Sequence, residues 1–308
     1  MRFKILCSKD LKNDFWEVLK SRERRRWLYF SSADEYIKWH SQLAILRVFW
    51  TVEEELLNYI IVKDKWDNIL AIGRMVKVPV VPWEKMQWNK SSEPRGDVRD
   101  FIIIKAESEI LEFLSNFFDA FFKSYDLSRW GISTWDPNTI RLLEKSKKFK
   151  RLKRSILLGW QLPLSIPNLR LNKKVSLKFA KTKEEIKKAY NVMKKSWNFV
   201  IYAKKDMEYI VLATINNTPV GMAYLNKETR NIDFGVHVVP EYRRKYIGTT
   251  IVKFVGDFCY KQLNKKWMFV VRLLPKDSLR NSDRVAIRFY VSTNAQVLRF
   301  YHCYKYVS

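Results

Sequence analysis

The second half of the chain carries two alternating hydrophobic patterns. Residues 184–196 and 247–263 have apolar side chains at helical spacing, whereas 209–215 and 219–226 are short apolar runs typical of strands. Asn216-Asn217 separates those two runs, which predicts a β-hairpin. The other predicted elements are strands at 176–180, 231–239 and 285–292 and a last helix at 295–304. Alternating strands and helices with an antiparallel hairpin predict an α/β fold with a mixed sheet.

The first half repeats this order of elements. Residues 4–21 and 178–196 both pass from a strand-like pattern into a helix that begins after a Ser or Thr cap. Residues 132–152 and 291–307 both offer a strand, an Asn, a helix and then an aromatic residue. We interpret this as an ancient duplication, with chance similarity between helices of like polarity as the alternative.

The chain length and a proline-interrupted segment both predict two domains. A chain of 308 residues exceeds the usual size of one domain. Pro163 and Pro167 interrupt any helix or central strand between the halves. We therefore expect domains at 1–160 and 175–308.

Composition excludes several classes of protein. Hydrophobic residues make up 47% of the chain and aromatic residues 15%, which is typical of packed domains and not of disordered ones. The longest apolar runs are too short to span a membrane, and the first residues lack a secretion signal, so we expect a cytoplasmic protein. Neither a zinc site nor a disulfide is expected from its few, widely separated Cys and His residues, Cys7, Cys259, Cys303, His40, His237 and His302.

The charge is strongly unbalanced. Lys and Arg number 58 against 32 Asp and Glu, a net charge of +26. Such a field attracts polyanions, so nucleic acid, either tRNA or DNA, is one partner hypothesis. The basic runs at 22–26 and 145–154 are suited to an acidic substrate or a nucleic acid. The alternative is a set of solvated lysines that keep the protein soluble.

A basic turn follows the strand predicted at 231–239. It contains a glycine and leads into the amphipathic helix at 247–263. Backbone N–H groups and the positive end of a helix dipole meet in such a turn, which suits a pyrophosphate. The residues expected to bind it are Arg243, Arg244, Lys245, Tyr246, Ile247, Gly248 and Thr249.

This segment resembles the acetyl-CoA-binding motif of GNAT acyltransferases, Gln/Arg-x-x-Gly-x-Gly/Ala after a strand that ends in Val-x-Pro-x-Tyr. The chain matches at Val238, Pro240, Tyr242, Arg243 and Gly248. Tyr246 stands in place of the first glycine, and its side chain is expected to weaken cofactor binding. A second motif of the family is similar to Asn294, the Phe300-Tyr301 pair and Tyr306.

The resemblance implies two tandem GNAT-like domains and acetyl-CoA as the cofactor. It also implies transfer of acetyl to an amine, with Tyr301 protonating the departing thiolate. Backbone groups of Val236, Val238 and Val239 would bind the pantetheine arm, and Asn294 would lie beside the cofactor. In the first half, the equivalent turn at 106–109 is acidic and lacks glycine, so we expect that domain to have lost the cofactor.

The general base is open at this stage. Asp233, His237 and Glu241 are candidates, and a water chain is the equal alternative. Asp233 and His237 lie opposite the face of Val236 and Val238 unless a bulge at Gly235 reverses the alternation.

The chain also stops before the two closing strands usual in the family. We therefore expect the first half, or a second copy in a homodimer, to complete the sheet edge.

The resulting functional hypothesis is an acetyl-CoA-dependent N-acetyltransferase with an unidentified acceptor on a protein, polyamine or tRNA. Two alternatives stay open: an aminoacyl-tRNA-dependent transferase and a non-enzymatic nucleic-acid-binding protein on the same scaffold.

Overall fold

The computed structural model describes residues 3–22, 30, 32–43, 54–78, 94–105, 108–164, 170–203, 208–274 and 282–307. They form two units, the first made of residues 1–155 and 300–308 and the second of residues 156–299. The basic run at 22–26 beyond Arg22 and the first two residues of the acidic turn at 106–109 lie outside the described residues. Within those residues, every helix is too short or too polar to cross a bilayer.

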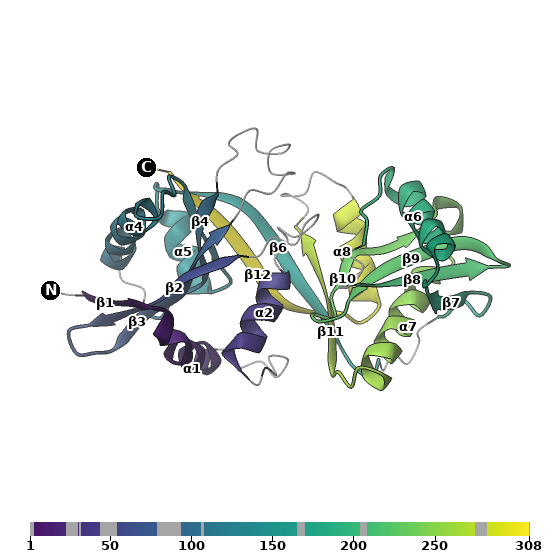
Figure 1. Ribbon diagram of the computed structural model, residues 1–308, viewed down its shortest axis with the longest axis horizontal. Helices are drawn as coiled ribbons and strands as arrows, with labels where there is room; N and C mark the ends of the chain where they lie inside the picture. Colours follow the sequence, from purple (N-terminus) through teal and green to yellow (C-terminus); the bar gives the residue numbers. More distant parts are fainter. Residues whose placement is uncertain are drawn as a thin grey trace. The chain divides into compact units, whose positions relative to one another are not determined.

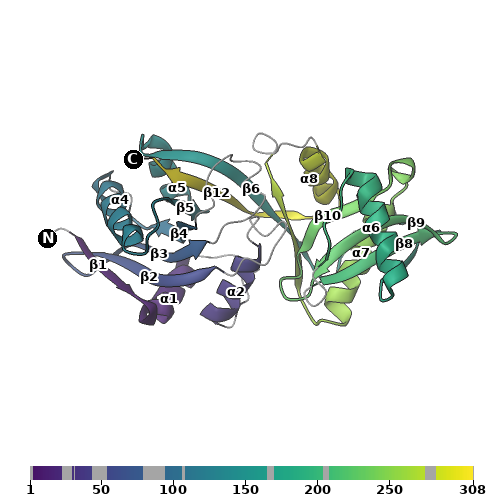
Figure 2. The ribbon, with the colours of Figure 1, turned by 45° about the horizontal axis from the view of Figure 1, so that its top comes forward.

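Unit 1 is a mixed sheet with helices on both faces. Strands β1 to β4 pair antiparallel in sequence order, and β4 pairs with β5 in parallel. Helices α1 and α2 lie on one side of the sheet and α4 and α5 on the other (Figures 1 and 2). The elements in chain order are β1 (Phe3–Ser8), α1 (Lys12–Arg22), α2 (Ala33–Leu43), β2 (Glu55–Asp64), β3 (Ile69–Val78), β4 (Arg95–Ile103), α4 (Ser108–Lys123), β5 (Trp130–Thr134), α5 (Pro137–Lys145) and β6 (Phe149–Gln161).

Among the described residues, the strands and helices of unit 2 follow the same order except that no helix corresponds to α2. Its antiparallel sheet follows the order β10-β9-β8-β7, and α6 and α7 cover opposite faces of it (Figure 1). The predicted hairpin is confirmed, and both Asn216 and Asn217 adopt the left-handed conformation its turn needs, with φ of 47° and 64°. The elements are β7 (Ser176–Phe179), α6 (Lys183–Trp197), β8 (Glu208–Ile215), β9 (Thr218–Asn226), β10 (Ile232–Val238), a 3-10 turn η3 (Pro240–Tyr242), α7 (Ile247–Lys261), β11 (Trp267–Leu273), α8 (Ser282–Ser292) and β12 (Gln296–Tyr306).

Strands β6 and β12, the last of each half, each have one end in unit 1 and the other in unit 2. The sheet that begins at β1 continues in the order β5-β12-β6-β11. In unit 1, β12 pairs antiparallel with β5, from His302 opposite Thr134 to Lys305 opposite Gly131. In unit 2, the end of β6 runs on to Leu162, whose amide donates to the carbonyl of Lys266 at 2.8 Å. The strand next to β11 is therefore supplied by the first half of the chain, and residues 300–308 belong to unit 1, whereas the sequence places them in a domain at 175–308.

Two elements near the C-terminus differ from their prediction. Residues 285–292, predicted as a strand, belong to α8, and residues 295–304, predicted as a helix, belong to β12. In α8 the buried residue is Tyr290, one and two turns after the half-buried Ala286 and Asp283, while Val285 is 68% exposed. β12 is rich in aromatic residues and lies between β5 and β6, so strand pairing decides its conformation.

The start of α6 yields a prediction on acid stability. Thr182 caps the helix, and the Glu185 carboxylate accepts hydrogen bonds from the amides of Lys181 and Thr182. The hydrogen bond from Lys178, followed by these amides, lowers the pKa of Glu185 from 4.5 to about 2. Because the folded-state pKa is depressed, this contribution to stability is complete above pH 4.5 and is lost as the pH falls toward 2.

We therefore expect Glu185→Gln to lower stability at pH 7 and to reduce the further loss between pH 4.5 and pH 2. Urea unfolding at several pH values measures both effects. Glu241→Gln is the control, because Glu241 is exposed and has no partner among the described residues. An identical acid dependence in wild type and Glu185→Gln would contradict the assignment.

Candidate active site at the bulge of β10

The central strand β10 is interrupted by a bulge at the predicted glycine. Asp233 pairs with Tyr224 and Val236 pairs with Ala223, so Phe234 and Gly235 are both inserted without partners on β9. Their φ angles are 58° and 93°, in the left-handed region. Because two residues are inserted, the alternation of faces is kept and not reversed: His237 stays opposite to Val236 and Val238.

Beyond the bulge, one edge of β10 points away from β9. The amide of Val239 donates to the carbonyl of Val220 at 3.0 Å, so backbone groups of Val236 and Val238 face the other way. Along that edge, the described residues of β10 and β11 share only one bridge, between Asn231 and Phe269. An extended ligand could pair with such an edge through its backbone groups. Val239 does not contribute its amide, which is already bonded to β9.

Tyr290 lies at this edge. It is 1% exposed, and its hydroxyl accepts a hydrogen bond from the amide of Val236 at 3.0 Å. Trp160 packs edge-on against the Tyr290 ring, with centroids 5.5 Å apart, and donates to the Thr293 carbonyl at 3.1 Å. The end of α8, and with it the phenol, is thereby fixed against β10.

Tyr290 is absent from the residues predicted from the sequence, which include Tyr301. The tripeptide Arg-Phe-Tyr occurs at 288–290 and again at 299–301, and the predicted motif falls on the second copy. Tyr301 lies on β12 in unit 1, with its ring centroid 5.4 Å from that of His40, so its predicted position on a helix is wrong. Asn294 follows α8 in a turn, with φ of 66°, and its amide donates to the carbonyl of Val291.

Two residues of the basic turn have a left-handed backbone, a conformation that glycine adopts more readily than other residues. Arg244 and Tyr246 have φ of 60° and 59°, and Tyr246 is the N-cap of α7. Tyr246 thus adopts the left-handed conformation itself, and its exposed side chain accepts a hydrogen bond from Arg170. Asn172 braces the turn, because its side-chain amide donates to the Lys245 carbonyl at 2.8 Å and its backbone amide to the Thr250 hydroxyl at 2.9 Å.

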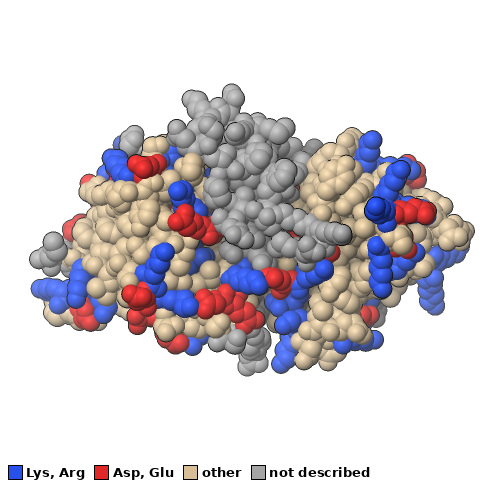
Figure 3. All heavy atoms as spheres, in the orientation of Figure 1, with Lys and Arg blue, Asp and Glu red and all other residues tan. Residues whose placement is uncertain are grey.

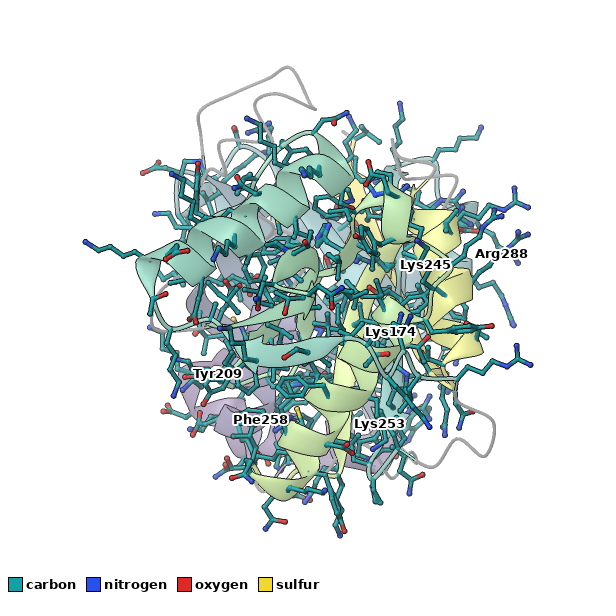
Figure 4. The ribbon with its side chains drawn as sticks, turned by 90° about the vertical axis from the view of Figure 1, so that its right-hand side faces the viewer. Lys174, Tyr209, Lys245, Lys253, Phe258 and Arg288 are labelled. Carbon is teal, nitrogen blue, oxygen red and sulfur yellow. The ribbon has the colours of Figure 1, made fainter. Side chains whose placement is uncertain are left out.

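The turn presents positive charge and free helix amides. Tyr246 makes no side-chain cap, so the first amides of α7, from Ile247, Gly248 and Thr249, point outward without an intrahelical partner. Gly248 lets this end of α7 approach α8, since a Cβ there would lie 2.9 Å from Phe289. Figure 4 shows basic side chains from four segments on this side of the unit, Lys174, Lys245, Lys253 and Arg288. Arg243, Arg244 and Lys245 are all exposed. The arrangement suits a diphosphate.

The three candidate general bases, Asp233, His237 and Glu241, differ in burial and in the groups that they contact. His237 is 1% exposed beneath Trp197, with ring centroids 4.3 Å apart and an interplanar angle of 87°. The Asp233 carboxylate accepts hydrogen bonds from the side-chain amides of Asn226 and Asn231. Glu241 is exposed in η3. On the face opposite to Val236, His237 thus packs against α6, and Asp233 ties the start of β10 to the end of β9.

Charge on the described surface is not uniform. On the face of unit 1 shown in Figure 3, acidic and basic side chains alternate, whereas Lys and Arg predominate over α6 of unit 2. Helix α6 alone has five lysines and two glutamates.

Comparisons with known proteins rest on structure. No family model and no curated protein matches this sequence. Among solved structures, a GCN5-related N-acetyltransferase from Sphaerobacter thermophilus is 9% identical, with a TM-score of 0.57 over 98% of this chain and 95% of that chain. A tandem GNAT protein from the clavulanic acid biosynthesis pathway is 10% identical, with a TM-score of 0.57 over 98% of each chain. A Drosophila protein is 9% identical, with a TM-score of 0.52 over 99% of this chain and 98% of that chain. At these identities the likeness establishes the fold.

Proposed function

We propose that this chain, which has the fold of the GCN5-related N-acetyltransferases, transfers an acyl group from an acyl-CoA, acetyl-CoA in the first instance, to an amine. One observation supports this most directly. The Val236 amide and the Tyr290 hydroxyl meet at the bulge of β10, on the same strand that leads into the basic turn before α7.

The residues of unit 2 fit an acyl-CoA along its length. Arg243, Lys245 and the first amides of α7 would bind the diphosphate. The carbonyl of Val236 and the amide of Val238, which face away from β9, would bind the pantetheine arm. The other two groups on that edge are already used, because the Val236 amide donates to Tyr290 and the Val238 carbonyl accepts from Arg243.

The chemistry at the bulge is assigned to this chain's own groups. When bound, an acyl-CoA supplies an activated thioester. The Tyr290 hydroxyl holds a proton at Oη, beside the bulge, and donates it to the leaving sulfur. Because Asp233 and His237 lie on the opposite face of β10, we assign removal of the surplus proton of the amine to water.

Unit 1 is assigned a supporting role with no cofactor. At the matching place on β4, the residue with a left-handed φ is Asp100, at 48°, and its carboxylate is bound by Arg74. Because Asp100 and Arg74 neutralise each other, this arginine is not available to a second diphosphate or thiolate. We therefore expect one acyl-CoA per chain.

Calorimetry and thermal unfolding with acetyl-CoA test the proposal. A ligand that binds only the folded state raises the melting temperature, by an amount equivalent to about 2.7 kcal/mol at a concentration 100 times its Kd. We expect one site per chain, weakened at least tenfold in the double variant Arg243→Ala/Lys245→Ala.

Lys187→Ala is the matched control, because Lys187 is exposed on α6. Absence of any stabilisation of the wild-type protein by saturating acetyl-CoA would exclude the proposed function. Binding of two molecules per chain would exclude the supporting role of unit 1.

A further inference from the structure

We propose that Arg272 is a second catalytic residue, which stabilises negative charge on the leaving sulfur together with Tyr290. The inference rests on the function proposed above. Arg272 lies on β11, where no candidate residue was predicted.

Arg272 reaches the bulge of β10. Its Nη2 atom lies 3.3 Å from the Tyr290 hydroxyl, and its guanidinium carbon lies 5.7 Å from the centre of the Tyr290 ring. A Cβ on Gly235 would lie 1.6 Å from the same Nη2. The missing side chain of Gly235 therefore makes room for the guanidinium at the bulge.

The hydrogen bonds of the Tyr290 hydroxyl leave its proton free to be donated. A phenol oxygen accepts up to two hydrogen bonds and donates one. Both acceptor positions of Tyr290 are used, by the Val236 amide at 3.0 Å and by Arg272 at 3.3 Å. Within the described part of the chain, no acceptor receives the hydroxyl proton. The hydroxyl proton is therefore available to a group that the described residues do not supply, such as a ligand. A hydroxyl that accepts two hydrogen bonds is also a stronger hydrogen-bond donor.

The positive charge of Arg272 is not paired with a carboxylate among the described residues. Its Nε is buried and has no hydrogen-bond partner among the described residues, and no described carboxylate forms an ion pair with it. Guanidinium stays charged at every pH of interest. A fixed cation and a hydroxyl proton thus converge at the edge of β10, which is the arrangement that an anion needs.

The irregular part of β4 in unit 1 also has an arginine beside it, but from a different strand. Arg74 lies on β3, which corresponds to β9 and not to β11, and donates two hydrogen bonds to Asp100, at 2.9 Å from Nε and 2.6 Å from Nη2. That cation is neutralised by the protein, whereas Arg272 has no carboxylate partner among the described residues.

Negative charge arises at this place during acyl transfer. The amine forms the new C–N bond as the C–S bond breaks, and the electron pair of the C–S bond goes to sulfur. The Tyr290 proton then completes the thiol, and the proton lost by the amine passes to water, from which Tyr290 is reprotonated. Arg272 interacts more strongly with the sulfur as its charge grows, so it lowers the barrier without strengthening substrate binding equally.

The test compares Arg272→Gln and Arg272→Lys with wild type. We expect Arg272→Gln to lower kcat about 100- to 1,000-fold, with KM for acetyl-CoA changed less than about threefold. Arg272→Lys keeps the charge without the planar donors, so its kcat is expected between the two. Arg141→Gln, an exposed arginine on α5, is the control.

A binding measurement separates charge stabilisation from a structural effect. Free CoA has a thiol that can ionise, whereas desulfo-CoA has none. We expect wild type to prefer CoA over desulfo-CoA increasingly from pH 7 to pH 9, and Arg272→Gln to lose that preference while it binds desulfo-CoA as wild type does. Thermal unfolding shows whether both variants are folded. If Arg272→Gln does not fold, the same kinetic and binding measurements are made on Arg272→Lys.

Three results would overturn the proposal. The first is a CoA preference and a kcat that survive in Arg272→Gln. The second is an equal loss of CoA and desulfo-CoA binding, which would assign Arg272 to the diphosphate. The third is a wild-type preference for succinyl-CoA over acetyl-CoA that Arg272→Gln abolishes, which would assign Arg272 to a carboxylate of the acyl chain. Failure of wild type to bind any acyl-CoA is a separate outcome that removes the proposed function itself.

Discussion

Replacing Tyr290 by phenylalanine is expected to lower kcat about 100- to 10,000-fold, the range contributed by a positioned general acid. The ring would keep its packing against Trp160, because only the hydroxyl is removed. The Val236 amide would lose its hydrogen-bond partner, which costs about 1 kcal/mol in stability. Steady-state kinetics with acetyl-CoA and a pool of amines, together with acetyl-CoA binding by calorimetry, measure the two effects separately.

The matched control for this experiment is Tyr301→Phe. The two tyrosines follow the same Arg-Phe dipeptide, but Tyr301 lies on β12 in unit 1 beside His40. We expect Tyr301→Phe to leave kcat within about twofold of wild type. If Tyr290→Phe retains full turnover, the phenol is not the acid, and a loss confined to Tyr301→Phe would restore the prediction made from the sequence.

Replacing Arg74 by methionine is expected to destabilise unit 1 by about 3–5 kcal/mol, the cost of leaving one member of a buried ion pair alone. Arg74 and Asp100 are 1% and 0% exposed in their side chains, and Tyr36 donates a third hydrogen bond to the same carboxylate at 2.9 Å. Burial is the largest single influence and by itself would lower the pKa of Arg74, but the charge of Asp100, the charge of Glu54 and the hydrogen bonds to Asp100 together raise the pKa above its ordinary value. In the variant, the buried carboxylate of Asp100 would lose its arginine and keep Tyr36 and His40 as neighbours, at 2.9 and 3.4 Å from Oδ1.

Urea unfolding followed by tryptophan fluorescence measures this loss. The double variant Arg74→Met/Asp100→Leu is expected to recover part of the stability, since it removes both charges. Lys12→Ala is the matched control for an exposed pair: Lys12 and Asp34 are 39% and 72% exposed, and the expected cost is below about 1 kcal/mol. If Arg74→Met and Lys12→Ala lower the free energy of unfolding equally, burial does not determine the contribution of the Arg74–Asp100 ion pair.

Several features were predictable from the sequence because they depend on neighbouring residues. The hairpin at Asn216-Asn217 follows from two residues that tolerate a left-handed backbone, and both have it. The turn from Pro240 to Thr249 follows from a strand, a basic run and an amphipathic helix within one continuous segment, and β10, η3 and α7 occur in that order. The mixed sheet follows from the alternation of these local patterns.

The C-terminal segment was not predictable in this way. A short apolar segment fits a helix or a strand equally well by periodicity, and the repeated Arg-Phe-Tyr offered two alignments of one motif. Pairing of β12 with β5 in unit 1 decides that residues 296–306 are a strand. The choice between Tyr290 and Tyr301 depends on that long-range pairing.

The sequence by itself determined the order of the elements and the position of the basic turn, because local backbone preferences and helix periodicity act over a few residues. Tertiary structure alone decided which tyrosine meets the Val236 amide, that the bulge inserts two residues, and that Arg272 stands over Gly235. These depend on the pairing of β10 with β9, the divergence of β11 and the docking of α8. Each brings together residues tens of positions apart, and no local pattern encodes such distances.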